Sequence, residues 1–288
     1  MPVSDHKMAN ESSTLVMNTA TVTVDNSNGS DAPTTFQDEL AGLKGRWSFI
    51  IMFACLQTAI GFQLGYIFCY TNQITPALNA KFGWEGSTAT INESIIGSCS
   101  TITLMISAAL SGSLVKYGRR PALIISALIG IVGTAITIYE NFWAILIGRL
   151  IYGFSVGIIA IAMPRLMEET VPGYLVGFYG GLYCLSFAIA TLLAYALAVF
   201  LPKDTDTEAL KETHMTQVIF GLPIVFYVIQ LALQFTYFRR DSVKFLLVGD
   251  YKYEAESEIQ KIYKGVDNEG SASLVAASLM KSVQKQTA

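Results

Sequence analysis

An arginine inside a long apolar run is the residue of this sequence with the clearest potential for chemistry. Arg149 lies about seven residues into the otherwise apolar segment 142–164. An ionisable side chain is costly to place in a membrane, so it is a functional candidate by default. Two interpretations stay open: a packed structural or gating role, or an arginine whose guanidinium reaches back to the membrane interface.

Glycines spaced four residues apart follow this arginine along the same segment. They are Gly153 and Gly157. Because glycine carries no side chain, this spacing lets a neighbouring helix approach closely. We predict helix packing at both positions, and at Gly65 in the apolar segment 47–70, within a protein of several packed spans.

A basic turn, Gly118-Arg119-Arg120, is a second candidate. Glycine permits a tight turn, and each guanidinium can form paired hydrogen bonds with a carboxylate. We predict that Arg119 and Arg120 belong to a charge network that latches helix ends together. The alternative is simple anchoring by positive charge on the cytoplasmic side.

Polar side chains within the apolar segments are candidates for a binding cavity. Polar groups in lipid must find partners, so these side chains should face the bundle interior or water. We predict a substrate-binding role for four of them, with ordinary hydrogen bonding between helices as the alternative. They are Gln57, Gln63, Tyr66 and Tyr183.

Composition places the chain among membrane proteins. Of its 288 residues, 52% are hydrophobic and only 14% are charged, and its mean hydropathy is +0.46. A soluble domain carries about 25% charged residues. The small net charge of −3 indicates that nucleic acid is not a partner. Four cysteines without paired spacing, two isolated histidines and the lack of glycine-loop or triad motifs predict no metal site, no cofactor and no enzymatic activity.

Six apolar segments provide the elements that must position these residues. Each is near the roughly 20 residues that a helix needs to cross the hydrocarbon core. We therefore predict an all-α membrane protein with six transmembrane helices bundled over 46–238. The segments are 47–70, 94–115, 122–139, 142–164, 176–201 and 218–238.

The flanking segments have a different character. Residues 1–45 are rich in Ser, Thr, Asn and Asp and predict a disordered cytoplasmic tail. The segment 239–265 has Ala255, Ile259 and Ile262 at helical spacing and predicts a short cytoplasmic amphipathic helix. Residues 266–288 are weakly patterned and predict a flexible tail.

Basic residues near the segment ends predict the orientation. One side collects about three times more Lys and Arg than the other, which makes it cytoplasmic. An even number of spans then places both termini in the cytoplasm, and we expect the plasma membrane rather than an organelle membrane. The two sets are Lys44, Arg46, Lys116, Arg119, Arg120, Arg165, Arg239, Arg240 and Lys244 against Lys81, Lys203 and Lys211.

Five motifs in order resemble the sugar porter family of the major facilitator superfamily, over about residues 46–265. Each motif alone is weak, but their shared order is specific. They are Gln63-Leu64-Gly65-Tyr66 for Q-F-G-Y, Gly118-Arg119-Arg120 for G-R-R, Gly148-Arg149 with Gly153 and Gly157 for G-R-x-x-x-G-x-x-x-G, Pro164 with Glu169 and Pro172 for P-x-Y-x-x-E-x-x-P, and Arg240 to Leu246 for a degraded P-E-S-P-R-F-L.

The resemblance implies the N-terminal six-helix half of a major facilitator fold and a small-molecule sugar substrate. It implies that Arg119 and Arg120 pair with carboxylates in a latch that breaks as the gate opens. Those carboxylates are Glu169 and Asp241. Arg149 would belong to the charge network on the outer side. Because this fold binds substrate between two halves, a second copy of the chain or a C-terminal half would be needed.

Four positions depart from the family pattern. Ile67 stands where proton-coupled members carry an aspartate, which favours facilitated diffusion. The family carries an acidic residue before the basic turn, and that position aligns near Val115 in this sequence. Its absence predicts a weaker latch. Leu64 and Cys184 replace a phenylalanine and a glutamine that contact sugar in the family.

We therefore predict facilitated transmembrane transport of a hexose-type sugar by a half-length carrier. The alternative is a non-transporting membrane scaffold or subunit derived from a sugar transporter. A truncated gene model is a further alternative, and six more apolar spans in the downstream coding sequence would identify it.

Overall fold

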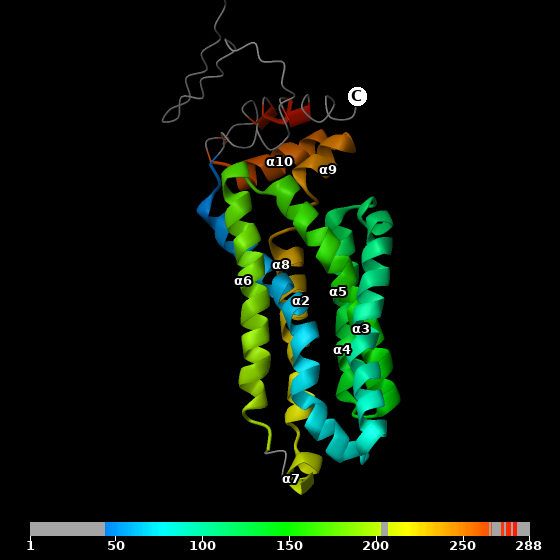
Figure 1. The fold of residues 1–288 in the computed structure, drawn as a ribbon. Coiled ribbons are helices and arrows are strands. Elements are labelled where there is room, and N and C mark those ends of the chain that lie inside the picture. The colour runs from blue at the N-terminus through cyan, green and yellow to red at the C-terminus, as the bar shows by residue number, and fades with distance from the viewer. Residues whose placement is uncertain are drawn as a thin grey trace, which may run out of the picture.

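The structure is a computed structural model that describes residues 44–202, 207–264 and 266, with 272–273, 275–277 and 279–280. The predicted tail 1–45 lies outside the described residues except for its last two positions. The described chain forms helices and one isolated bridge between Gly45 and Tyr263. The helices are α2 (Trp47–Phe82), α3 (Gly86–Val115), α4 (Arg119–Ile138), α5 (Phe142–Thr170), α6 (Gly173–Ala198), α7 (Thr207–Glu212), α8 (Met215–Thr236), α9 (Val243–Val248) and α10 (Lys252–Ile262) (Figure 1).

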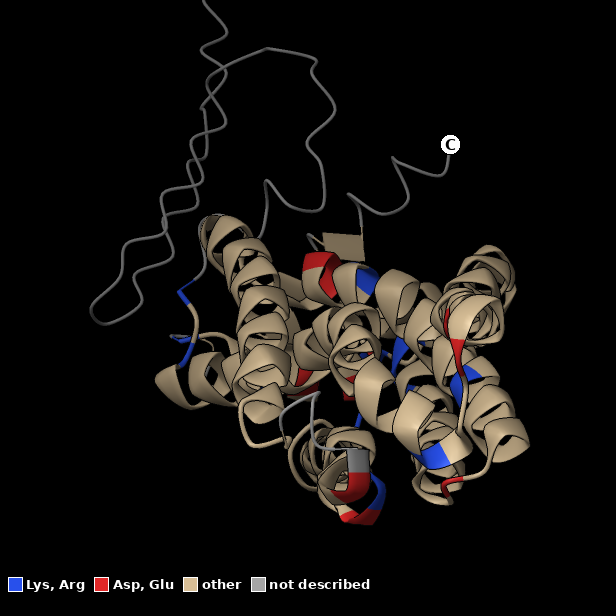
Figure 2. Ribbon diagram, turned by 60° about the horizontal axis from the view of Figure 1, so that its bottom comes forward, with Lys and Arg blue, Asp and Glu red and all other residues tan. Residues whose placement is uncertain are grey.

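The predicted all-α fold with six membrane spans is confirmed for the described part of the chain. Helices α2, α3, α4, α5, α6 and α8 are long and apolar enough to cross a membrane. Charged residues are sparse along their ribbons (Figure 2). The protein is therefore a multi-pass membrane protein.

Two long helices continue past the positions where the sequence predicts their ends. Helix α2 runs through Pro76 to Phe82 rather than ending at Tyr70, and it bends toward α3 near its end (Figure 1). Proline removes one backbone donor and kinks a helix without always ending it. The helix ends where Gly83 adopts a left-handed φ of 65°, and the Gly83 N–H caps the carbonyl of Asn79.

Helix α5 likewise runs through Pro164 to Thr170, so the predicted end of this segment at Pro164 is wrong. Glu169 lies in the last turn of α5 instead of in a loop. The residues that follow the proline stay helical because Leu166 and Met167 are buried, and because Glu169 is held by a partner on α4.

Close packing assembles the helices into two groups. Helix α5 packs against α3 and α4, whereas α2 packs against α6 and α8, and contacts between α4 and α8 join the groups (Figure 1). Helices α3 and α6 bury the smallest share of their surface. The bundle therefore has a well-covered interior around α2 and α5 and two open flanks.

Glycines lie at the tightest helix contacts. A Cβ added at Gly157 would overlap Ser107 and Leu104 of α3, and one at Gly153 would overlap Ser100 and Thr103. A Cβ at Gly65 would lie 2.8 Å from the Cα of Phe187 on α6. The three glycines predicted to pack helices therefore lie where a neighbouring backbone leaves no room for a side chain.

The amphipathic helix predicted after the last span is confirmed as α10. Ala255, Ile259 and Ile262 are all buried. A backbone hydrogen bond joins its end to the residue before α2, because the Arg46 N–H donates to the carbonyl of Ile262 at 2.8 Å. Within the predicted tail 266–288, the described residues of 272–280 are helical. The weak sequence pattern does not indicate this helical structure.

The glycine contacts give a direct test of the packing between α3 and α5. Gly157→Ala places a methyl group against α3 and should lower the free energy of unfolding by about 1–3 kcal/mol. Gly97→Ala is the matched control, because nothing lies within 4 Å of the added Cβ at that position of α3. It should be neutral or stabilise by up to about 1 kcal/mol. Thermal unfolding in detergent measures both, and equal effects would contradict the packing.

Candidate functional site

The first charged cluster lies at the end of the bundle that carries α9 and α10, which we call the α10 end. The Arg119 Nη2 of α4 donates to Oε1 of Glu169 on α5 at 2.6 Å. Ser242, at the start of α9, donates its hydroxyl to the other oxygen of Glu169 at 2.7 Å. Both side chains of the ion pair are less than one fifth exposed. This ion pair therefore ties three elements together where solvent screens it little.

Asp241 closes the same cluster from the segment between α8 and α9. Its carboxylate accepts the backbone N–H groups of Arg119 at 3.1 Å and Ser242 at 2.8 Å, and so caps the start of α4. Burial raises the pKa of Asp241, and these donors together with the Arg119 charge oppose that rise. Gly118 has a φ of 132°, and a Cβ there would collide with Asp241, so the turn requires glycine. We call Arg119, Glu169, Asp241 and Ser242 the latch cluster.

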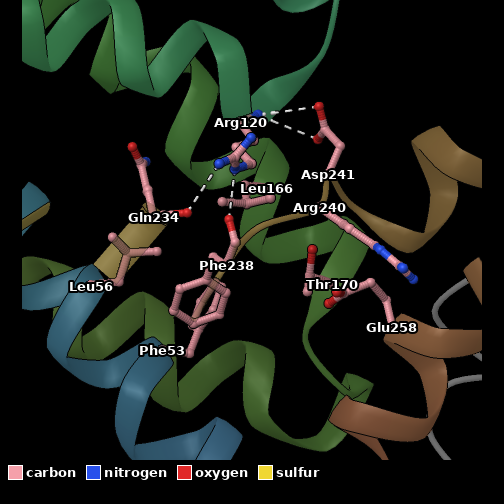
Figure 3. Close-up of a pocket in the computed structure, with 10 residues that line it drawn as sticks. All are labelled: Phe53, Leu56, Arg120, Leu166, Thr170, Gln234, Phe238, Arg240, Asp241 and Glu258. Carbon is pink, nitrogen blue, oxygen red and sulfur yellow. Dashed lines mark hydrogen bonds between the residues drawn. The ribbon is translucent and has the colours of Figure 1, made fainter. Parts of the chain in front are cut away.

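Arg120 faces a different set of partners. Its Nε donates to the carbonyl of Phe238 at 2.6 Å and its Nη2 to the carbonyl of Gln234 at 3.2 Å (Figure 3). Its backbone N–H contacts Asp241 at 3.3 Å. The Arg120 side chain thus satisfies the last carbonyls of α8, where a cation is favourable.

A small cavity adjoins Arg120 between α2, α5, α8 and α10 (Figure 3). Its volume is about 20 Å³, whereas pockets for small-molecule ligands measure roughly 300–1,000 Å³. Arg240 and Glu258 lie on its rim, and burial raises the pKa of Glu258 against the attraction of Lys261 and Arg240. The cavity has room for water and not for a sugar.

Arg149 is buried in the bundle, with 1% of its surface exposed. Its Nε donates to the carbonyl of Ile96 at 2.7 Å, its Nη2 to the Ser100 hydroxyl at 2.7 Å, and its Nη1 to the Thr71 hydroxyl. Its guanidinium carbon lies 5.0 Å from the centre of the Tyr70 ring. The side chain therefore joins α5 to α2 and α3 instead of reaching the bundle surface.

Two of the predicted substrate residues are engaged by α8. Gln63 donates its amide to the carbonyl of Pro223 at 3.0 Å, and Tyr66 donates its hydroxyl to the carbonyl of Ile219 at 2.8 Å. Tyr152 donates to the side-chain oxygen of Gln63 at 3.2 Å. Both Gln63 and Tyr66 are fully buried. In this conformation they hold α2 against α5 and α8.

The other two predicted substrate residues have free polar atoms. Among the described residues, Oε1 of Gln57 and the hydroxyl of Tyr183 are buried and have no hydrogen-bond partner. A Cβ on Gly61 would touch the Tyr183 ring at 3.0 Å, and Gln57 lies one turn before Gly61 on α2. Both unsatisfied atoms therefore belong to the region between α2 and α6.

A second ion pair, which the sequence does not predict, lies at the opposite end of the bundle from α10. Lys81 Nζ, at the end of α2, contacts Glu140 Oε1 at 2.6 Å and the hydroxyl of Thr216 on α8 at 2.8 Å. The same ammonium donates to the carbonyl of Thr213 at 2.9 Å. Glu140 lies between two predicted segments, but Lys81 lies in the predicted loop between 70 and 94, so the sequence carries no signal that pairs them. It ties α2 to the α4–α5 turn and to α8.

Solved structures with the same fold are membrane transporters of the major facilitator superfamily. The proton:xylose symporter XylE bound to 6-bromo-6-deoxy-D-glucose matches with a TM-score of 0.69 and 18% identity, over 82% of this chain and 54% of that chain. A partially occluded inward-open XylE from E. coli matches with a TM-score of 0.68 and 17% identity, over 83% of this chain and 59% of that chain. At these identities the likeness establishes the fold alone, and it confirms a half of a major facilitator fold.

Sequence comparison then defines the family. The family profile described as "Sugar (and other) transporter" matches residues 50–288. The chain is 34% identical to Sugar transporter ERD6-like 6 of Arabidopsis thaliana over 162 residues, which is 54% of this chain and 32% of that protein. It is 26% identical to Hexose transporter 1 of Plasmodium vivax (strain Brazil I) over 230 residues, or 76% of this chain and 45% of that protein. The chain belongs to the sugar porter family of the major facilitator superfamily, as its motifs predict.

The sequence matches cover only part of each relative. The chain spans about a third to a half of the length of these relatives. The matched region carries six spans and the amphipathic helix, which together correspond to one half of the carrier fold.

The latch cluster predicts a local effect of removing one charge. Glu169→Gln deletes the charge that faces Arg119 and should lower the free energy of unfolding by about 1.5–3 kcal/mol. Hydrogen exchange should accelerate at 166–172 and 242–247. Glu212→Gln removes an exposed carboxylate on α7, at the other end of the bundle, and serves as the control. The same exchange pattern in both variants would contradict the latch.

Proposed function

We propose that this chain acts in facilitated transport of a hexose-type sugar, as the N-terminal half of a carrier that rocks against a second half. The observation that carries the proposal is the latch cluster. In a chain of the sugar transporter family, it joins α4, α5 and α9 through one ion pair and its hydrogen bonds. Such pairs are suited to rigid-body gating, because separating the helix ends breaks them as a unit.

Substrate binding is best supported between α2 and α6. Gln57 and Tyr183 hold buried polar atoms without partners among the described residues, and a sugar hydroxyl would satisfy such atoms. Gln63 and Tyr66 would also bind the sugar, but only in a conformation where their hydrogen bonds to α8 are broken and replaced by hydrogen bonds to the sugar. Relatives of the chain are named hexose transporters, which supports a hexose as the substrate class.

Several properties of the mechanism belong to the same proposal. Ile67 is apolar where proton-coupled members carry an acid, which supports facilitated diffusion. Transport of this kind needs no cofactor and no catalytic step. The excess of Lys and Arg at the α10 end supports a cytoplasmic location for that end and for both termini, and we propose the plasma membrane as the site.

The second half would dock against the open flanks of the bundle. Nothing in the described structure lies within 4 Å of a Cβ added at Gly177, Gly180 or Gly181 of α6, or at Gly112 of α3. Small residues on an exposed membrane helix allow close helix contacts. A second copy of the chain or a C-terminal half would supply the covering helices.

A non-transporting scaffold or subunit is the second candidate. Its support is that Gln63 and Tyr66 are committed to backbone carbonyls of α8, and that Cys184 stands where the family carries a sugar-binding glutamine. Under this reading, the polar residues of α2 only hold the bundle together.

Reconstitution separates the two candidates. The purified full chain in proteoliposomes should exchange labelled glucose or a related hexose, with a particle mass of two chains. Tyr183→Phe removes the free hydroxyl and should raise the half-saturating sugar concentration severalfold, because a lost hydrogen bond costs roughly 0.5–1.5 kcal/mol. Tyr139→Phe, which removes an exposed hydroxyl at the end of α4, is the control. No exchange together with a monomeric mass would overturn the self-assembled carrier and favour the scaffold.

A further inference from the structure

The buried guanidinium of Arg149 is surrounded by neutral groups. Its hydrogen-bond partners in the described structure are a backbone carbonyl and two hydroxyls, and the ring beside it belongs to a tyrosine. An ionised group that is taken out of water needs a counter-charge as well as hydrogen bonds to offset its lost solvation. A carboxylate should therefore lie within electrostatic reach of Arg149.

Glu93 lies on the face of α3 that binds Arg149. The two α3 groups that accept from the guanidinium belong to Ile96 and Ser100. Glu93 precedes them by three and seven residues, which places all three on one side of a helix. At about 1.5 Å of rise per residue, Glu93 is roughly 4.5 Å along the axis from Ile96.

A small cavity is lined both by Glu93 and by Thr71, whose hydroxyl binds Arg149. Glu93, Ile96 and Thr71 all line it, and its volume of about 10 Å³ corresponds to a single water. Thr71 also accepts a hydrogen bond from Arg149, so the cavity borders the guanidinium site. Glu93 and the hydroxyl that accepts from Arg149 thus line the same water-sized space.

The far side of the cavity holds Glu93 in place. Asn79 Nδ2 of α2 donates to Glu93 Oε1 at 2.5 Å, and the side-chain oxygen of Asn79, Oδ1, has no partner among the described residues. Lys81, the basic residue next along α2, is bound to Glu140 and Thr216. The carboxylate of Glu93 is therefore positioned by a neutral amide, and its charge is left to act on Arg149.

We infer that Glu93 is the counter-charge of Arg149, a positioning residue on α3 that stabilises the buried guanidinium across the cavity lined by Thr71. It supplies from the second span the acid that the first span lacks at Ile67. The two charges bind the outer part of α3 to α5. This role does not depend on sugar transport, since it operates in the folded bundle.

A double-mutant cycle on the purified full chain tests the pair. Glu93→Gln keeps the shape and the acceptor for Asn79 and removes only the charge. Glu93→Gln and Arg149→Gln should each lower the melting temperature, and the double variant should lose at least about 3 °C less than the sum of the two. Glu85→Gln, an exposed acid just before α3, should be additive with Arg149→Gln.

Two outcomes would overturn the inference. One is additivity of Glu93→Gln with Arg149→Gln, as for the Glu85 control. The other is an unchanged melting temperature in Glu93→Gln alone, which decides the matter even where Arg149→Gln fails to fold. Glu93→Asp restores the charge and should recover most of the lost melting temperature, whereas a purely steric role would leave it as low as Glu93→Gln. Because the readout is stability, failure here leaves the transport assay unaffected.

Discussion

The hydrogen bonding of one buried guanidinium is the constraint on which the packing of this bundle depends. Arg149 is 1% exposed, so each of its donors must find an acceptor inside the protein. Those acceptors come from Thr71 of α2 and from Ile96 and Ser100 of α3. The position and rotation of both helices relative to α5 are therefore fixed, and Gly153, one turn further along α5, lets α3 lie close enough to reach the guanidinium.

Ionic contacts at both ends of the bundle complete this arrangement. The latch cluster joins α4, α5 and α9 at one end, and the pair of Lys81 with Glu140 joins α2 to the α4–α5 turn at the other. Between them, Gln63 and Tyr66 of α2 contact α8 through neutral hydrogen bonds to backbone carbonyls. These ion pairs therefore hold helix ends together within this half of the fold.

Sequence alone predicts the spans, the family and the amphipathic helix, because hydropathy and motif order are local signals. It ends two helices too early, at Tyr70 and at Pro164, whereas both continue through a proline because tertiary contacts outweigh one lost backbone bond. It also misses Lys81 with Glu140, since 59 residues separate the partners. The sequence also does not predict the partner of a polar side chain in a span. Such a side chain faces the interior whether it binds substrate or a neighbouring carbonyl.

The most direct test of this account is hydrogen exchange in Arg149→Lys. Lysine keeps the charge but cannot present donors in the fixed fork that three separate acceptors require. Exchange should accelerate at 68–75 of α2 and 94–101 of α3, while the latch region 166–172 stays at its wild-type rate. Unchanged exchange in α2 and α3, or a uniform increase over all helices, would contradict the claim that Arg149 sets the packing of these helices.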